Sequence, residues 1–514
     1  MTRAAGSGGL LLGLGLATWM EFYSYDGVNL VLPDMAGGFG LSQDEASWIL
    51  TSYLAGLFYG VPVSIWLAAH IGYRRFLILT TACFAITALG CMLAPDFPTL
   101  LLCRTVQGFA GAGLVMWWRA SVYMLFTGPV RSASLMRISV ILYLGTAAGL
   151  LFCGWITDHF SWRLLFLPDL LCAPFAIALL HRHFPDVAPP ETARATDWPG
   201  LVLLAIGLAA LQALLSRGDI DDWFAASHIQ LLGWVAGLAL GAFTIWQLHL
   251  ANAAPLLRLR LVANRNLQAA ICLGLCAGLI LSGAIYAFPE FLRTTFPTPL
   301  SATQTGRIMC IYALTAAAIR PLVTPAIARF GPRKVISFAF LALIAAMFSA
   351  WRLLTLQTPP LYYALPLVLY AFCLAPMLSA IGSGAVSKLP PASQLDAVAI
   401  YMSFRQFGAA LGVTFVTTLL NWRETLHSSR LLTLPPQAAA PLQAWLATMG
   451  NTAQSRAGAM PGEAQHIAMA ALARAVQAQA QTLSYADAFL CMAGIGVLAL
   501  FAVGLMAPFK KAPS

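Results

Sequence analysis

Ionisable residues within long apolar stretches are the residues of this sequence best placed to do chemistry. Glu21 and Asp26 lie in one such stretch, Arg104 in a second and Asp169 in a third. A charge in a bilayer interior costs about 2.5–3.5 kcal/mol on insertion scales, so it usually marks a pathway or a buried pair. Carboxyl groups withdrawn from water can bind and release protons near neutral pH. The pattern therefore predicts proton handling inside a membrane.

Glu21, Asp26 and Arg104 are the predicted proton-coupling residues. Glu21 and Asp26 are separated by about 140° around an ideal helix, so we expect them not to form one shared site. Gly27 follows Asp26 and makes a bend easy there. A fixed cation at Arg104 would change how tightly a nearby carboxyl holds its proton. The alternatives are a purely structural ion pair for Arg104 and a role near the outer surface for Asp26.

A second group of polar residues is predicted to line a substrate pathway: Asp169, Gln107, Arg405 and Asn29. Asp169 could recognise a cationic group or bind a second proton, or it could simply pair with Arg163. An anionic substrate would instead use cations such as Arg320 and Arg405. Arg119 is expected to be an anchor at the membrane surface. The acids and arginines together leave the charge of a substrate open.

The elements that position these residues are membrane-spanning helices. Of the 514 residues, 60% are hydrophobic and 9% are charged, far from the soluble average. A span needs about 20 mainly apolar residues, and about fourteen segments qualify. A spanning segment surrounded by lipid must satisfy its backbone internally, which favours helices. The predicted spans are 8–32, 46–68, 76–94, 98–119, 134–156, 163–182, 198–215, 229–250, 268–289, 306–327, 335–353, 362–385, 397–420 and 486–508.

Basic residues predict the orientation of these spans. The formal net charge is +10, which in a soluble protein would suggest nucleic acid as a partner. Here Arg and Lys gather in the short loops of one side, so we expect both termini in the cytoplasm and no nucleic acid. Gly72, Arg74 and Arg75 form one such turn, and the segment 67–75 (LAAHIGYRR) is echoed by 326–334 (AIARFGPRK). The echo suggests a duplicated bundle and a conformational role for this turn.

The predicted organisation has three parts. An N-terminal six-helix bundle covers 1–185, two inserted helices with linkers cover 186–262, and a C-terminal six-helix bundle covers 263–514. Gly145 and Gly149 have the spacing that lets two helices approach closely, and we expect them at the interface between the halves. Residues 421–485 form a long outer loop with helix-like stretches near 438–449 and 462–483. This loop could be a solvated cap or a docking surface.

Enzyme chemistry is not expected. The ten cysteines lie mostly in apolar runs and lack metal-ligand spacing, so they are interpreted as small buried hydrophobes. The sequence has no His/Asp metal cluster, no Ser–His–Asp arrangement and no evident cleavable signal peptide. We therefore expect no catalytic residues, no metal and no cofactor.

Several segments together resemble a known family. The segment 101–113 (LLCRTVQGFAGAG) contains an intramembrane Arg–x–x–Gln–Gly motif, 25–33 (YDGVNLVLP) a first-helix motif with Asn29, and 145–155 (GTAAGLLFCGW) a glycine-rich motif. Further matches are 161–166, 255–267, 403–415 and 479–490. The chain resembles major facilitator superfamily exporters of the fourteen-helix drug:proton antiporter group, close to the inner-membrane component of EmrAB-type pumps. It departs from that pattern at Ser24, where Asp is usual, and at Asp169, where Asn is usual.

The resemblance implies a function. It implies a secondary active, proton-coupled exporter of amphipathic organic compounds or drugs, working by alternating access in the inner (cytoplasmic) membrane. Its partners would be a small-molecule substrate, protons and the lipid bilayer, with a periplasmic adaptor protein and an outer-membrane channel where a second membrane exists. The alternatives are a dedicated exporter of one metabolite, such as an aromatic acid or siderophore-like anion, and a transport-inactive receptor or assembly platform.

Overall fold

The chain folds into a bundle of long helices. The computed structural model describes residues 7–187, 196–218, 221–250, 252, 255–296, 298–386, 389–433, 439–457 and 460–506, and these residues contain helices and connecting turns but no strands. The α-helices among the described residues are α1 (Ser7–Phe39), α2 (Gln43–Ile71), α3 (Tyr73–Leu93), α4 (Phe97–Leu125), α5 (Gly128–Ala148), α6 (Gly154–His159), α7 (Leu167–His183), α8 (Trp198–Arg217), α9 (Ser227–Leu248), α10 (Arg265–Glu290), α11 (Ala302–Phe330), α12 (Pro332–Leu353), α13 (Ala364–Ala385), α14 (Pro391–Leu432), α15 (Ala439–Ala457) and α16 (Pro461–Val503).

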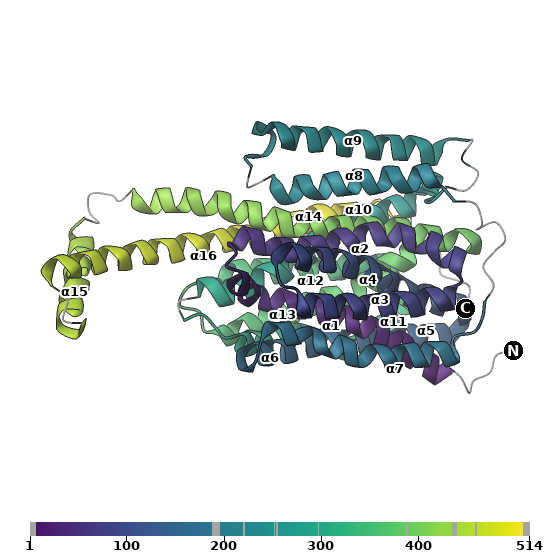
Figure 1. Ribbon diagram of the computed structural model, residues 1–514, viewed down its shortest axis with the longest axis horizontal. Helices are drawn as coiled ribbons and strands as arrows, with labels where there is room; N and C mark the ends of the chain where they lie inside the picture. The colour runs from purple at the N-terminus through teal and green to yellow at the C-terminus, as the bar shows by residue number, and fades with distance from the viewer. Residues whose placement is uncertain are drawn as a thin grey trace.

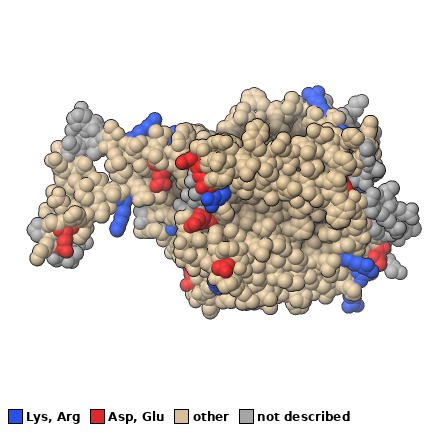
Figure 2. Space-filling model, turned by 45° about the horizontal axis from the view of Figure 1, so that its top comes forward, with Lys and Arg blue, Asp and Glu red and all other residues tan. Residues whose placement is uncertain are grey.

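Each predicted span overlaps a helical segment, but α1, α14 and α16 are much longer than the spans 8–32, 397–420 and 486–508. The last two predicted positions, 507–508, lie outside the described residues. Twelve helices in the described part of the chain are long and apolar enough to cross a membrane. Helices α1 and α14 are also long enough, but they are more polar and carry Glu21, Asp26 and Arg405. Figure 2 shows a side of the molecule that is almost free of charged side chains between its two ends. The molecule is therefore an all-helical integral membrane protein.

The helices form two groups joined along two seams. In the first group α1 packs on α5 and α7, and α2 packs on α4; in the second, α10 packs on α14, and α12 packs on α13 and α16. The seams between the groups are α2 against α14 and α5 against α11. Helices α8 and α9 form a separate hairpin at one side, with α9 outermost, and α8 contacts α2 (Figure 1). This arrangement places α14 at the seam beside the α8–α9 hairpin and α1 in contact with both groups.

Asp197 ties the α8–α9 hairpin together at the N-terminus of α8. Its carboxylate accepts hydrogen bonds from the backbone N–H of Gly200 (2.9 Å) and of Leu256 (3.1 Å) and from the side chains of Trp246 (2.6 Å) and Gln247 (2.5 Å). Burial opposes ionisation, but these hydrogen bonds outweigh it and hold the pKa of Asp197 below its usual value. One carboxylate thus fixes both helices and the linker that follows them.

The close approach predicted at Gly145 and Gly149 is present, but its location was predicted wrongly. A β-carbon on Gly145 would lie 2.9 Å from the carbonyl oxygen of Trp19, and one on Gly149 would press on the carbonyl of Tyr23. Both glycines therefore pack against α1 of the same half, because helical spacing identifies a close-packing face without identifying its neighbour.

A different pair of glycines forms the close approach between the halves. A β-carbon on Gly154 would lie 2.5 Å from the carbonyl oxygen of Ala302, and one on Gly306 would collide with the carbonyl of Leu150. A π-helical turn at Gly149–Cys153 connects α5 to α6 at this seam. Turns of this kind often mark functional sites within helices.

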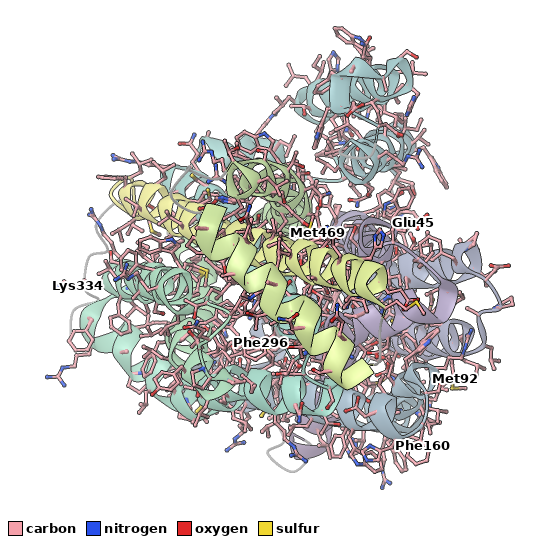
Figure 3. The ribbon with its side chains drawn as sticks, turned by 90° about the vertical axis from the view of Figure 1, so that its left-hand side faces the viewer. Glu45, Met92, Phe160, Phe296, Lys334 and Met469 are labelled. Carbon is pink, nitrogen blue, oxygen red and sulfur yellow. The ribbon has the colours of Figure 1, made fainter. Side chains whose placement is uncertain are left out.

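The predicted outer loop is mainly helical. Helices α14 and α16 continue beyond the bundle, and α15 joins them at the tip (Figure 1). In the end-on view α15 crosses in front of the bundle end that Met92 and Phe160 mark (Figure 3). At the base, Arg423 (2.6 Å) and His427 (2.7 Å) of α14 both bind Asp487 of α16. We call residues 421–485 the helical extension and this end of the bundle the extended end.

The seam glycine Gly306 provides a test of the packing. We expect Gly306→Leu to destabilise the purified protein by about 1–3 kcal/mol, because overpacking a tight helix contact forces backbone shifts. The measurement is the thermal unfolding midpoint in detergent. The matched control is Gly237→Leu on α9, where a β-carbon would meet nothing within 4 Å. Equal midpoints for both variants would contradict the seam.

Candidate functional site

Two adjoining cavities lie between the halves of the bundle. The larger has a volume of about 650 Å³, and the smaller, deeper one has a volume of about 100 Å³. Trp118 and Arg119 border both of them. The larger cavity reaches Tyr73, Arg131 and Ala328, which lie at the end of the bundle opposite the helical extension. Helix α1 begins and α16 ends at this end, beside the turns that carry Arg74 and Arg333. We call it the basic end because of these arginines.

The smaller cavity contains the two carboxylates predicted on α1. Glu21 is 4% exposed and accepts a hydrogen bond from the Tyr53 hydroxyl (3.1 Å), while its second oxygen has no partner. Asp26 is 3% exposed and accepts hydrogen bonds from Thr146 (2.7 Å) and Tyr312 (3.1 Å). Thr146 is on α5 and Tyr312 is on α11, so Asp26 connects the two halves.

The expectation that Glu21 and Asp26 do not share a site is wrong in one respect. Their angular separation on α1 gives them different hydrogen-bond partners, as helical geometry requires. Both nevertheless border the same cavity, because it extends around the side of α1 that faces the second half. Two carboxylates in one small cavity influence each other's ionisation.

Arg104 is fully buried on α4 and reaches Glu21 only through another side chain. It donates a hydrogen bond to Gln107 (2.7 Å), and its guanidinium lies 4.3 Å from the ring centroid of Tyr53. Tyr53 in turn donates to Glu21. Gln107 is also fully buried and borders neither cavity. The structure thus places Tyr53 between the predicted cation and the predicted carboxylate, a role that the sequence reasoning missed.

Asp169 is fully buried on α7. Ser24 of α1 and Arg104 of α4 are among the groups that interact with it. Arg163, the alternative partner considered for Asp169, donates instead to the carbonyl of Ala94 (2.6 Å). Asp169 borders neither cavity, so its surroundings favour a role within the buried polar network over direct substrate contact.

The two remaining predicted pathway residues, Arg405 and Asn29, differ in whether they border a cavity. Arg405 borders the smaller cavity. Asn29 donates a hydrogen bond to the carbonyl of Tyr25 (3.0 Å) on its own helix and borders neither cavity. Arg119, expected as a surface anchor, instead borders both cavities together with polar groups of the second half.

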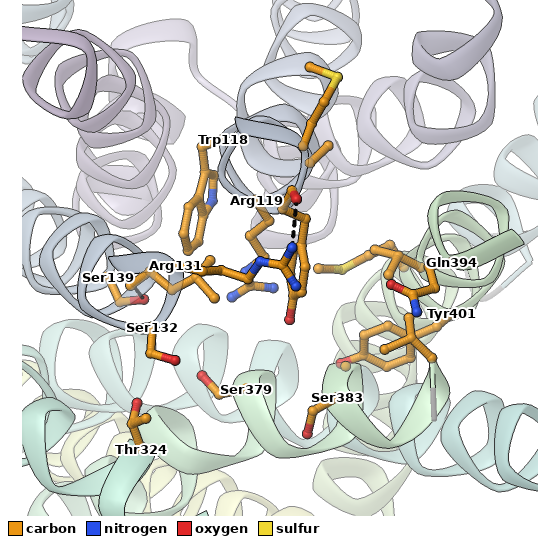
Figure 4. A pocket seen from close by; sticks show the side chains of 18 of the residues that line it. Trp118, Arg119, Arg131, Ser132, Ser139, Thr324, Ser379, Ser383, Gln394 and Tyr401 are labelled. Atoms are coloured by element: carbon orange, nitrogen blue, oxygen red, sulfur yellow. Dashed lines mark hydrogen bonds between the residues drawn. The ribbon is translucent and has the colours of Figure 1, made fainter. Parts of the chain in front are cut away.

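Arginines and hydroxyl groups characterise the larger cavity. Arg119, Arg131 and Arg320 line it, and Figure 4 shows Arg119 and Arg131 facing Ser379 and Ser383 across the cavity. Among the described residues, no Asp or Glu lines this cavity. The sequence offered one signal for this site, Arg320 within an apolar helix, but it did not indicate that the three arginines converge.

The halves are joined at the extended end by polar contacts that the sequence reasoning missed. Arg293 donates to both carboxylate oxygens of Asp34, one at 2.9 Å, and also to the carbonyl of Leu30 (3.0 Å). Asp158 accepts from the backbone N–H groups of Ala302 (3.1 Å) and Thr303 (2.8 Å) at the N-terminus of α11. We call the Asp34–Arg293 pair and the Asp158 contact the outer latch.

The predicted gating turn lies at the basic end. Gly72 has φ 89° between α2 and α3, and Gly331 has φ 81° between α11 and α12. These are conformations that favour glycine, so the two echoed segments use the same kind of turn in the two halves. Arg74 donates to the carbonyl of His181 at the end of α7, while Arg75 is exposed.

Comparisons with known proteins agree with this architecture. The family model of the Major Facilitator Superfamily matches residues 14–413. The colistin resistance protein EmrB of Acinetobacter baumannii is 27% identical over 487 residues, covering 93% of this chain and 92% of that protein. The probable multidrug resistance protein EmrY of Escherichia coli is 29% identical over 446 residues, covering 84% of each chain.

A solved structure supports the fold independently. The bacterial homologue of the human lysosomal transporter Spinster, in an inward-facing and unoccupied conformation, superposes with a TM-score of 0.62 at 16% identity. The match covers 98% of each chain. The family match along most of the chain and the shared helical bundle confirm the resemblance seen in the motifs: the chain belongs to the Major Facilitator Superfamily.

Proposed function

We propose that this chain is a proton-coupled exporter of amphipathic small molecules that works by alternating access. The observation that carries the proposal is the position of Asp26, a buried carboxylate that borders a cavity and binds hydroxyl groups of both halves. The similarity to an EmrY-type multidrug resistance protein and to a colistin resistance protein supports export as the direction of transport.

Proton binding at Asp26 would change a contact between the halves. An ionised carboxylate accepts the hydrogen bonds of both Thr146 and Tyr312. A proton on either oxygen adds a donor and makes that oxygen a weaker acceptor, so protonation changes at least one of these contacts. Because Tyr312 belongs to the second half, protonation is thermodynamically linked to the relative position of the halves. Glu21, joined to Arg104 through Tyr53, is the second proposed proton site.

The orientation and the moving parts follow from charge and packing. We place the basic end and both termini in the cytoplasm and the helical extension outside, in an inner membrane, because basic residues remain on the cytoplasmic side. The larger cavity then faces the cytoplasm, and the outer latch closes the opposite end of the bundle.

We propose 1–185 and 263–514 as the two halves that move relative to each other, with 186–262 as an inserted pair of helices. The turn at Gly72, Arg74 and Arg75 and the glycines Gly145 and Gly149 would shape this motion.

The helical extension supports an adaptor as partner. Helix α15 contacts α16 and lies away from the bundle, so it is available to another protein outside the membrane (Figure 1). We propose a periplasmic adaptor, leading to an outer-membrane channel, as that partner. Transport itself requires only the substrate, protons and the bilayer.

Neutral variants of the α1 acids test proton coupling. We expect Asp26→Asn and Glu21→Gln to lose proton-driven substrate uptake into inverted vesicles by more than about tenfold while retaining substrate exchange without a gradient, because exchange needs binding but no proton cycle. Asp222→Asn is the matched control, since Asp222 is exposed and has φ 54°, a conformation that Asn tolerates. Full gradient-driven uptake in both acid variants would remove these carboxylates from the coupling.

The outer latch can be tested by breaking and reversing its ion pair. We expect Arg293→Ala to raise the labelling rate of a single cysteine at Thr303 several-fold in a cysteine-free background, because the extended end opens more often. The exchanged pair Asp34→Arg with Arg293→Asp should lower the rate again, since it restores opposite charges. Unchanged labelling in Arg293→Ala would show that the pair does not hold the outer end closed.

Removal of the tip tests the adaptor proposal. We expect replacement of 434–460 by a short Gly/Ser linker to abolish co-purification with the adaptor while leaving vesicle uptake intact, because α15 lies away from the cavities. The control at the same end is Asp222→Asn, which should keep the complex. Recovery of an intact complex after the replacement would argue against docking through the tip.

A further inference from the structure

The larger cavity carries positive charge that no acid in its wall balances. Arg119, Arg131 and Arg320 line it without an Asp or Glu. None of the three belongs to an ion pair among the described residues. Arg119 also interacts electrostatically with Arg320 and with Arg405 of the smaller cavity. Like charges that approach in a weakly polar region are unfavourable, so an anion between them would stabilise the site.

Two buried donors in the wall of this cavity lack a hydrogen-bond partner among the described residues. Arg320 is only 3% exposed, and its Nη1 has no hydrogen-bond partner. The Tyr401 hydroxyl in the same wall is fully buried and also lacks a partner. Arg131 differs, because it donates to the carbonyls of Phe126 (2.8 Å) and Tyr123 (3.1 Å) and is held in place by them. A buried donor without a partner is costly unless something else binds it.

The remainder of the wall suits an amphipathic molecule. Trp117 and Trp118 of α4 and Val398 and Met402 of α14 provide apolar surface. The hydroxyl groups of Ser379 and Ser383, which face Arg119 in Figure 4, add neutral polar surface. A volume of about 650 Å³ lies in the usual range for small organic ligands. A guanidinium group matches the two oxygens of a carboxylate or the oxygens of a sulfonate or phosphate.

We propose that the larger cavity is a binding site for amphipathic organic anions, with Arg320 and Arg119 binding the acidic group and the aromatic wall binding the apolar body. The proposal rests on the proposed export function and adds the charge of its substrates. A cation in the larger cavity would lie beside three arginines, and no Asp or Glu is among the described residues of its wall, so cations are disfavoured there. Arg119 borders both cavities, so it can interact electrostatically with a bound anion in one cavity and with Glu21 and Asp26 in the other.

Three ligands of nearly equal shape test the proposal: 1-naphthoate, neutral 1-naphthamide and cationic 1-naphthylmethylammonium. Binding is measured by equilibrium dialysis of radiolabelled ligand against the full chain in lipid nanodiscs. We expect the acid to bind at least about tenfold more tightly than the amide, the size expected for hydrogen bonds to a charged group. Arg320→Gln and Arg119→Gln should each remove most of that preference while amide binding, which reports a folded cavity, stays unchanged.

Arg307→Gln is the matched control, because Arg307 lies on the same helix as Arg320 but is exposed and outside the cavity. It should leave the preference intact. Equal affinity for the acid, the amide and the amine would overturn the anion site, and so would an unchanged preference in Arg320→Gln.

Parallel uptake into inverted vesicles separates this proposal from the export function. Proton-driven uptake of the amide and the amine without an arginine-dependent preference for the acid would overturn the anion site and leave export standing. Arginine-dependent binding of the acid without proton-driven uptake of any of the three ligands would support the site and overturn the proposed function.

Discussion

The cost of leaving charge in hydrocarbon is the constraint on which the rest of the structure depends. Most spans meet it by excluding charge, so the side of the bundle is nearly uncharged between its ends (Figure 2). Helices α1, α4, α7, α11 and α14 do not exclude it. Their charged groups then face cavities or polar neighbours instead of lipid: Asp26 faces two hydroxyls, and Arg405 faces the smaller cavity. Charge within a span and burial of that charge between helices are therefore two aspects of one constraint.

The balance of charge changes along the axis of the molecule. The basic end leads into a cavity lined by arginines, the deeper cavity holds both carboxylates together with Arg119 and Arg405, and the extended end is closed by the Asp34–Arg293 pair. Each region connects the two halves in a different way. A change of protonation in the middle region thus alters a contact that holds the two halves in this relative position. This is the physical basis of the proposed coupling.

The sequence predicted where the helices lie along the chain, but it did not predict which helices and side chains pack against one another. Apolar length alone located the spans, and buried charge identified Glu21, Asp26, Arg104 and Arg405 as unusual. Tyr53, Thr146 and Tyr312, which bind those acids, had no signal, because a single hydroxyl in an apolar helix is common and its partner comes from another helix. Gly145 and Gly306 both lie in predicted spans, yet one packs within a half and the other between halves. Such pairings depend on tertiary packing, which helical periodicity does not encode.

The central claim is that protonation of Asp26 changes the relative position of the two halves. Electron-spin distance measurements between labels at Phe160 and Arg307, exposed residues of the two halves near the outer latch, test it most directly when they are made at acidic and alkaline pH in nanodiscs. The account predicts that the distance distribution of the otherwise unaltered protein changes between the two pH values and that Asp26→Asn loses this change. A pH response that is the same in the Asp26→Asn protein would contradict it.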